Sequence, residues 1–192
     1  MRNLFTLFSV FCVLFVSAGC SINVKKNDNG EDKKVDIDTP FGGIHVNKDA
    51  DVRDTGLSVY PGAKLKPKDN SDDEKSANVD ISTSSFGLKV VALEYDTSDV
   101  PDKVIAYYRN ELKKYGNVLE CHTQGHHYGY HNTNPDKGDS EELKCEGDND
   151  GKTIELKAGS KSNQHIVAVE PQDKGSDFSL VYVRMHGKEA TI

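Results

Sequence analysis

The chain has 192 residues, 35% of them hydrophobic, and its 24 basic and 31 acidic residues give a net charge of −7. An acidic surface repels phosphate backbones and anionic headgroups, so we expect neither a nucleic-acid partner nor a basic lipid-binding face. The length fits one domain with a tail, and a low aromatic content without Trp predicts a modest core.

Residues 1–19 have the layout of a secretory signal peptide. Arg2 gives a short cationic start, an apolar run extends from Leu4 to Val16, and small residues precede Cys20. The alternative is a transmembrane helix, but a span needs about 20 apolar residues and this run is shorter. We therefore expect residues 1–19 to be removed, which takes away one base, Arg2, and lowers the net charge from −7 to −8.

The end of this segment, Ser17-Ala18-Gly19-Cys20, resembles the lipobox of bacterial lipoproteins, although Ser17 stands where Leu, Val or Ile is usual. The resemblance implies cleavage after Gly19, a thioether-linked diacylglyceryl group on Cys20 and acylation of the new amino terminus. Three acyl chains exceed the two signals that stable membrane anchoring needs. Enteric-type lipoproteins kept at the inner membrane carry Asp after the cysteine. Ser21 therefore implies the outer membrane, facing the periplasm.

Two cysteines remain for the folded protein, because Cys12 leaves with the signal peptide and Cys20 takes the lipid. In an exported chain, Cys121 and Cys145 predict a single disulfide. Their spacing excludes a Cys-x-x-Cys redox motif. The entropic gain from closing such a loop is roughly 3 kcal/mol.

The chain after Cys20 is expected to begin with a lipidated cysteine and flexible tether over residues 20–33, which are too polar to offset the entropy of ordering. Residues 34–57 then predict a short hairpin-like segment. Its apolar residues flank Pro40 and two glycines, and they are Val35, Ile37, Phe41, Ile44 and Val46.

A globular domain is expected over residues 58–186, with a tail at 187–192. Tyr60-Pro61-Gly62-Ala63 predicts a turn. An alternating segment from Val79 and a β-rich run over 88–95 predict two antiparallel strands, the second of them central.

One helix is predicted over residues 101–115. Ser98 or Asp99 would cap its start, and Gly116 would end it. One side of the helix carries large apolar side chains every four residues, at Val104, Tyr108 and Leu112. Packing on a sheet explains this spacing, whereas an aromatic ligand platform is the alternative.

Strands and turns follow the helix. The strand candidates are 117–123, 142–147, 152–158, 164–170 and 177–185. In residues 153–158 apolar and polar residues alternate, which predicts a sheet with one wet face. By the same parity, the Cys121–Cys145 bridge would lie on the core side near the helix. The expected fold is α+β, with one main helix packed on a meandering antiparallel sheet in two layers.

Four histidines form the candidate metal site: His122, His126, His127 and His131. Imidazole suits Zn²⁺, Cu²⁺ or Ni²⁺. In an extended segment His126 and His127 would point to opposite faces, so chelation needs a folded loop. The glycines, asparagines and proline of residues 124–140 are typical of a long solvated connection. We expect that loop, with a Zn or Cu site as the alternative and no other cofactor.

An acidic stretch, residues 146–151, invites comparison with a calcium loop. Counted from Glu146, the twelfth position is Lys157, where a calcium loop requires a bidentate Glu. Asn and Asp next to Gly favour a hairpin turn instead.

The sequence contains none of the hydrolase motifs Gly-x-Ser-x-Gly, Ser-x-x-Lys and His-Glu-x-x-His. Residues 58–186 resemble uncharacterised exported bacterial proteins in one layout, Tyr-Pro-Gly-Ala at 60–63 and then Val104-x-x-Tyr107-Tyr108-x-x-x-Leu112. This resemblance implies no activity. We expect a non-catalytic, membrane-anchored envelope lipoprotein that binds, with an envelope protein as possible partner. The alternatives are a periplasmic metal-binding protein and an unrecognised envelope hydrolase.

Overall fold

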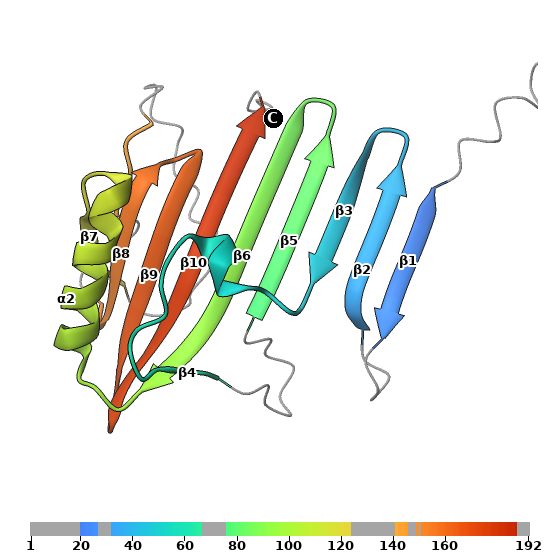
Figure 1. Cartoon of the computed structure of the whole chain (residues 1–192). Coiled ribbons are helices and arrows are strands. Elements are labelled where there is room, and N and C mark those ends of the chain that lie inside the picture. Colours follow the sequence, from blue (N-terminus) through green and yellow to red (C-terminus); the bar gives the residue numbers. More distant parts are fainter. Residues whose placement is uncertain are drawn as a thin grey trace, which may run out of the picture.

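One antiparallel sheet dominates the computed structural model (Figure 1). The structure describes residues 20–26, 32–66, 76–123, 141–145, 149 and 151–187. In spatial order the strands are β1 (Ser21–Lys26), β2 (Asp32–Thr39), β3 (Gly42–Asn47), β5 (Ser76–Thr83), β6 (Phe86–Thr97), β10 (Gly175–Gly187), β9 (Asn163–Gln172), β8 (Thr153–Ser160) and β7 (Leu119–Thr123). The short strand β4 (Lys64–Leu65) pairs with β6 outside this order.

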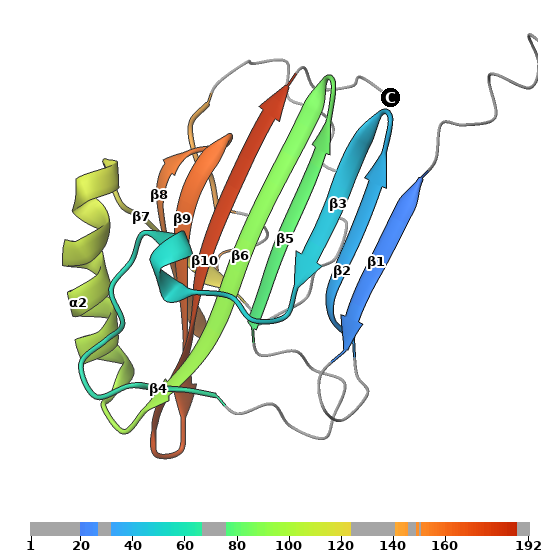
Figure 2. The same cartoon turned by 45° about the vertical axis from the view of Figure 1, so that its right-hand side comes forward.

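The helix α2 (Pro101–Leu112) connects the middle of the sheet to its edge, since it follows β6 and precedes β7. A short 3-10 turn, η2 (Lys113–Tyr115), extends it to the predicted end. The predicted α+β class and the antiparallel sheet are confirmed. However, α2 packs on β8, β9 and β10, and the sheet extends well beyond it (Figure 2). The molecule is therefore one long sheet covered over part of one face, and not strictly two layers.

The core lies between α2 and this part of the sheet. The predicted helix stripe is confirmed, because Val104, Tyr108 and Leu112 are fully buried. Alternate residues of β6 point toward the helix, and each buried aliphatic side chain contributes about 1.5–3 kcal/mol. The buried cluster comprises Leu57, Tyr60, Val91, Leu93, Tyr95, Val104, Ile105, Tyr108, Leu112, Leu156, Ala158, Val167, Val169, Phe178 and Leu180.

The start of α2 differs from the prediction. Its N-cap is Val100, whose side chain has no hydrogen-bond acceptor, so α2 has no side-chain cap. The Asp99 carboxylate, one of the two predicted caps, makes other contacts. That carboxylate accepts hydrogen bonds from Lys103 Nζ at 2.7 Å and from the Tyr60 hydroxyl at 2.9 Å. These two bonds hold the pKa of Asp99 below its ordinary value. Pro101, at the first helical position, has no backbone N–H. The uncapped first turn of α2 therefore has one fewer N–H group without a partner than it would have with another residue there.

Residues 50–63, which we call the strap, lie on the same side of the sheet as α2 and include the 3-10 turn η1 (Val52–Thr55). Leu57 and Tyr60 bury their side chains in the core. The buried Tyr108 hydroxyl accepts a hydrogen bond from the Tyr60 N–H at 3.0 Å and donates to the Ser58 carbonyl at 3.1 Å. Burial raises the pKa of Tyr108 well above its ordinary value. One hydroxyl therefore pairs two backbone groups of the strap.

The amino-terminal strands correct the predicted organisation. Residues 21–26, expected within the tether over 20–33, form β1 and pair with β2. Composition alone missed β1 because this segment is mostly polar. Its two apolar residues, Ile22 and Val24, alternate with polar residues and lie opposite Ile37 and Val35 of β2. Residues 27–31 lie outside the described part of the chain.

The hairpin expected within 34–57 is present as β2 and β3. It is not a separate segment, because β3 pairs with β5 and the sheet continues into the domain expected from residue 58. Of the later strand candidates, 142–147 is wrong where the structure describes it, since residues 141–145 form no strand. The others correspond to β7, β8, β9 and β10.

The Tyr108 hydroxyl provides a test of how the strap is held. We expect Tyr108→Phe to lower the free energy of unfolding by about 1–3 kcal/mol, because it leaves the buried Tyr60 N–H and the partly buried Ser58 carbonyl without their partner. Urea denaturation measures this change. Tyr107→Phe is the matched control, because the Tyr107 hydroxyl has no hydrogen bond to a described residue. Equal losses in the two variants would contradict this role of Tyr108.

Candidate functional site

The predicted lipidation site lies at one corner of the sheet. Cys20 is exposed, makes no disulfide, and directly precedes β1. The residues of the predicted signal peptide, 1–19, lie outside the described part of the chain. An acyl group on Cys20 would therefore be attached next to the edge strand.

The predicted disulfide is confirmed. Cys121 and Cys145 are bonded, with their Cα atoms 5.4 Å apart. The predicted position on the core side is wrong. Cys121 lies opposite Glu155, on the side of β8 that faces away from α2, whereas Leu156 faces the core. The bridge holds residues 141–145 against that far side, where Glu141 accepts a hydrogen bond from the Ser162 hydroxyl at 2.8 Å.

Reduction of the disulfide should lower the free energy of unfolding by roughly 3 kcal/mol, because it frees a loop with a sequence separation of 24. The measurement is urea denaturation with and without dithiothreitol, in a Cys20→Ser background that prevents thiol exchange. A variant that also carries Cys121→Ala and Cys145→Ala should not respond to the reductant. An equal response would show that the effect does not come from this bridge.

The candidate metal site stays a prediction. Only His122 of the four histidines is described, and its Nε2 lies 3.9 Å from a Glu120 carboxylate oxygen. His126, His127 and His131 lie outside the described residues. Within the described ranges no three His, Cys, Asp or Glu side chains are grouped so that they could hold a metal ion.

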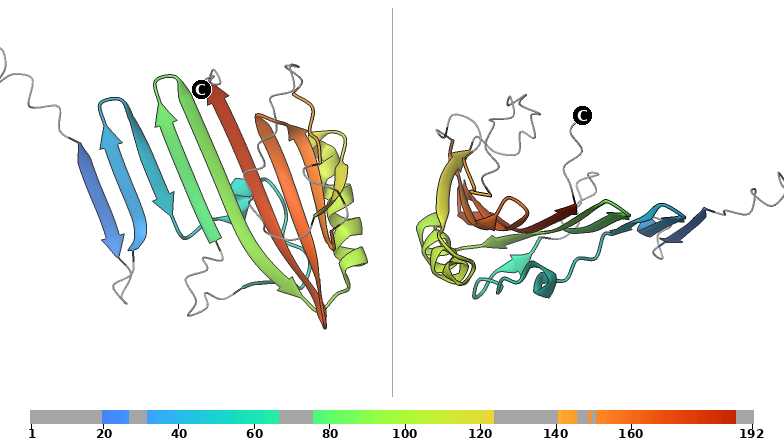
Figure 3. Two further views of the ribbon diagram at one scale, coloured as in Figure 1. Left: turned by 180° about the vertical axis from the view of Figure 1, so that it is seen from behind. Right: turned by 90° about the horizontal axis from the view of Figure 1, so that it is seen from above.

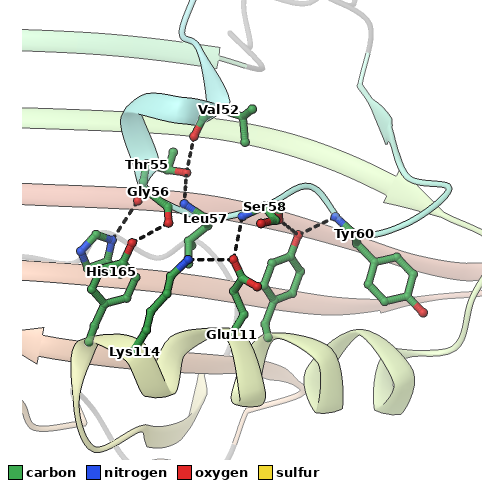
Figure 4. Close-up of polar contacts among 11 residues, drawn as sticks. Val52, Thr55, Gly56, Leu57, Ser58, Tyr60, Glu111, Lys114 and His165 are labelled. Carbon is green, nitrogen blue, oxygen red and sulfur yellow. Dashed lines mark hydrogen bonds and ion pairs between the residues drawn. The ribbon is translucent and has the colours of Figure 1, made fainter.

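A buried histidine that the sequence did not single out joins the strap to β9 and the helix end (Figure 4). His165 Nδ1 lies 2.8 Å from the Thr55 carbonyl, which can only accept, so Nδ1 carries the proton. The imidazole stacks on the Tyr115 ring at 3.5 Å between centroids, and the Tyr115 hydroxyl donates to the Gly56 carbonyl. Gly56 has a φ of +69°. A Cβ there would also lie 2.5 Å from the Tyr115 hydroxyl, so both backbone and space favour glycine.

Two helix residues hold the next part of the strap. A Glu111 carboxylate oxygen accepts hydrogen bonds from the Ser58 N–H at 3.0 Å and from Lys114 Nζ at 2.9 Å. The hydrogen bonds of this cluster join the strap to α2, η2 and β9. We therefore interpret the cluster as a structural clasp.

The clasp makes stability depend on pH. Burial lowers the pKa of His165 from its ordinary 6.5, so the unfolded chain takes up a proton at a higher pH than the folded chain does. The stabilisation is therefore complete above about pH 6.5 and is lost as the pH falls from there through the folded pKa.

Urea denaturation at about pH 7.5 and about pH 5.5 should show lower stability at the lower pH. His165→Asn keeps a donor near the Thr55 carbonyl but cannot titrate, so we expect a smaller difference between the two pH values. His122→Asn, on the edge strand, is the control and should retain the difference. A full difference in His165→Asn would assign the pH dependence to other groups.

A small hollow lies among residues of β6, β8, β9 and β10. Its volume is about 40 Å³, and the partly buried ion pair between Lys66 Nζ and Asp177, 2.7 Å long, lines it together with Glu94. This space holds one or two water molecules, whereas sites for small-molecule ligands have volumes of about 300–1,000 Å³. The hollow is therefore not a substrate pocket.

The largest feature without a structural partner is a set of apolar side chains on the side of the sheet opposite α2. They form two rows across six strands, each residue directly opposite the next. One row is Ile22, Ile37, Ile44, Ile81, Leu88 and Met185, and the other is Val24, Val35, Val46, Val79, Val90 and Val183. We call these twelve residues the aliphatic face. At about 4.8 Å per strand, it extends roughly 24 Å across the sheet.

The reverse side of the same strands is polar. The residues directly behind the aliphatic face include Asn23, Asp36, His45, Asp80, Lys89 and Arg184. Asp36 accepts a hydrogen bond from His45 Nδ1 at 3.0 Å and pairs with Lys34 at 3.1 Å, and these contacts lower the pKa of Asp36. Over the span of the two rows, the charged side chains therefore lie on the side opposite the aliphatic face.

The described elements leave the aliphatic face uncovered. Both α2 and η1 lie on the opposite side of the sheet (Figure 3, right), and none of the twelve residues belongs to the buried core. Four of the twelve are exposed, namely Ile22, Val24, Ile44 and Met185, and the other eight are half-buried beside their neighbours in the sheet. In each strand, the two apolar residues that flank one polar residue are visible in the sequence. That all six of these pairs lie on the same side of the sheet depends on the register, which the sequence did not show.

Comparison with known proteins adds no relative. No significant similarity links the chain to a family model, a curated protein or a solved structure. None of the described helices is long and apolar enough to cross a bilayer. What the chain does must therefore follow from its own residues.

Proposed function

We propose that this chain is a lipid-anchored protein of the bacterial envelope, acylated on Cys20 and held at the outer membrane facing the periplasm. Two features support the anchor: the lipobox-like residues before Cys20, and the exposure of that cysteine at the sheet corner. The Cys121–Cys145 disulfide is compatible with an oxidising compartment outside the cytoplasm.

We further propose that the folded part works by binding and not by catalysis. The observation that carries this proposal is the aliphatic face. The largest continuous apolar patch on a soluble monomeric protein is often functional, as a site of contact with proteins or membranes. Cross-strand pairs of aliphatic residues stabilise the sheet, but strand pairing alone does not require twelve apolar residues without a polar interruption.

The position of β1 changes how the anchor would act. A flexible tether would let the domain move away from the bilayer, whereas β1 begins at Ser21, one residue after the lipidated position. The acyl chains would thus hold the edge of the sheet at the membrane surface. The aliphatic face begins at Ile22, so the anchor and the apolar surface adjoin.

Mass spectrometry of the protein from a bacterial membrane fraction tests the anchor. We expect a chain that starts at Cys20 and carries a diacylglyceryl group and an amino-terminal acyl group. Cys20→Ser should move the protein out of the membrane fraction. Cys12→Ser is the matched control and should leave lipidation unchanged, because that residue leaves with the signal peptide. An intact leader, or an unmodified thiol at Cys20, would refute the anchor.

A further inference from the structure

The exposed apolar side chains gather at one end of the sheet. We call this the anchor end; it holds Cys20, the β2–β3 turn at 40–41 and the β5–β6 turn at 84–85 (Figure 1). The register aligns these segments, because Ser21 lies opposite Asp38 and Ser82 lies opposite Gly87. Five strands, β1, β2, β3, β5 and β6, thus begin or end at the same end of the sheet as the lipidation site.

The two most exposed apolar side chains of the described residues lie at this end. Phe41 is 83% exposed in the β2–β3 turn, and Ile22 is 68% exposed near the start of β1. Ile44, Phe86 and Met185 are 40%, 38% and 37% exposed. Leu65 and Val100 are also exposed, at 49% and 54%, but they lie at the opposite end of the sheet, beside β4 and the start of α2.

We infer that the anchor end rests on the lipid bilayer, with the aliphatic face turned toward it and Phe41 and Ile22 in the interfacial region. The inference deepens the proposed function and depends on it, because the acyl anchor brings this end to the membrane. Apolar side chains that enter the boundary between headgroups and acyl chains strengthen membrane binding in proportion to the area they bury.

The distribution of charge favours this orientation. The two rows contain no ionisable side chain, so their contact with lipid desolvates no charge. Asp38, His45 and Arg184 lie near the same end, but on the opposite side of the sheet, where they stay in water. The contact is therefore with neutral lipid, which also agrees with a chain of net negative charge.

A second copy of the chain fits the face less well. Two rows of side chains across six strands cover roughly 24 Å by 12 Å, or about 300 Å² per copy. Two copies stacked through this face would bury about 600 Å² in total, whereas a stable interface needs about 1,200 Å² or more. A bilayer has no such minimum, because the acyl anchor already holds the protein in place.

The test uses the mature chain, residues 20–192, with one saturated acyl chain attached to Cys20 through a maleimide. Cys20 is the single free thiol of this chain, since Cys121 and Cys145 are bonded. One acyl chain alone gives only marginal partitioning, with a constant of about 10⁴ M⁻¹. Partitioning is measured by sedimentation with phosphatidylcholine vesicles.

We expect the double variant Ile22→Ser/Phe41→Ser to lower the partition constant at least tenfold. The matched control, Leu65→Ser/Val100→Ser, removes two exposed apolar side chains from the other end and should change it less than twofold. Equal losses in the two variants, or no loss in either, would overturn the inference.

A second readout does not depend on the serine variants folding. The chain contains no Trp, so Phe41→Trp introduces a single fluorophore in the turn. With vesicles that contain brominated phosphatidylcholine, we expect a blue shift and quenching of its emission, but neither in Leu65→Trp. Unquenched emission from Phe41→Trp in bound protein would rule out the contact.

Further outcomes show whether the proposed anchor or the bilayer contact has failed. If analytical ultracentrifugation without lipid shows a dimer that Ile22→Ser dissociates, the face binds a second copy and the inference is wrong. Because the lipid is attached chemically, the vesicle test is independent of lipidation in the cell. An unmodified Cys20 in native protein therefore refutes the proposed anchor, whereas unquenched emission refutes the bilayer contact alone.

Discussion

The structure depends on the register of β6 and β10 in the middle of the sheet. Along β6 the large apolar residues change sides: Leu88 and Val90 belong to the aliphatic face, whereas Val91, Leu93 and Tyr95 point into the core under α2. A strand exposes successive side chains on opposite faces. One continuous strand thus supplies a buried core at one end and, at the other, part of a face that the described elements do not cover. A register slip of one residue would exchange the two faces in the neighbouring strands.

The strap completes the core that this register begins. It buries Leu57 and Tyr60 against α2, and its backbone polar groups are paired by side chains from α2 and β9. Buried polar groups cost free energy unless they are hydrogen-bonded, so Tyr108, Glu111 and His165 make this irregular segment compatible with burial. No described segment covers the aliphatic face of the amino-terminal strands in this way. These strands depend on cross-strand pairing.

The relation between anchor and sheet gives the proposed function its physical content. Because β1 begins directly after Cys20, acyl chains there would restrain the sheet to the bilayer and present one particular end of it. The absence of ionisable side chains from the two rows of the aliphatic face would then decide which surface faces lipid. The disulfide lies far from this end in the strand order, on β7.

The sequence alone predicted the α+β class, the helix at 101–115 with its apolar stripe, the β2–β3 hairpin and the pairing of Cys121 with Cys145. These features depend on local periodicity, turn residues or a simple count of cysteines. Only the tertiary structure decided that residues 21–26 are a strand, that the disulfide lies away from the helix, and that His165 is buried in a clasp. It also showed that apolar pairs from six strands share one face. All of these depend on the partners that a residue meets across the sheet, and strand order and register are set by contacts between segments far apart in the sequence.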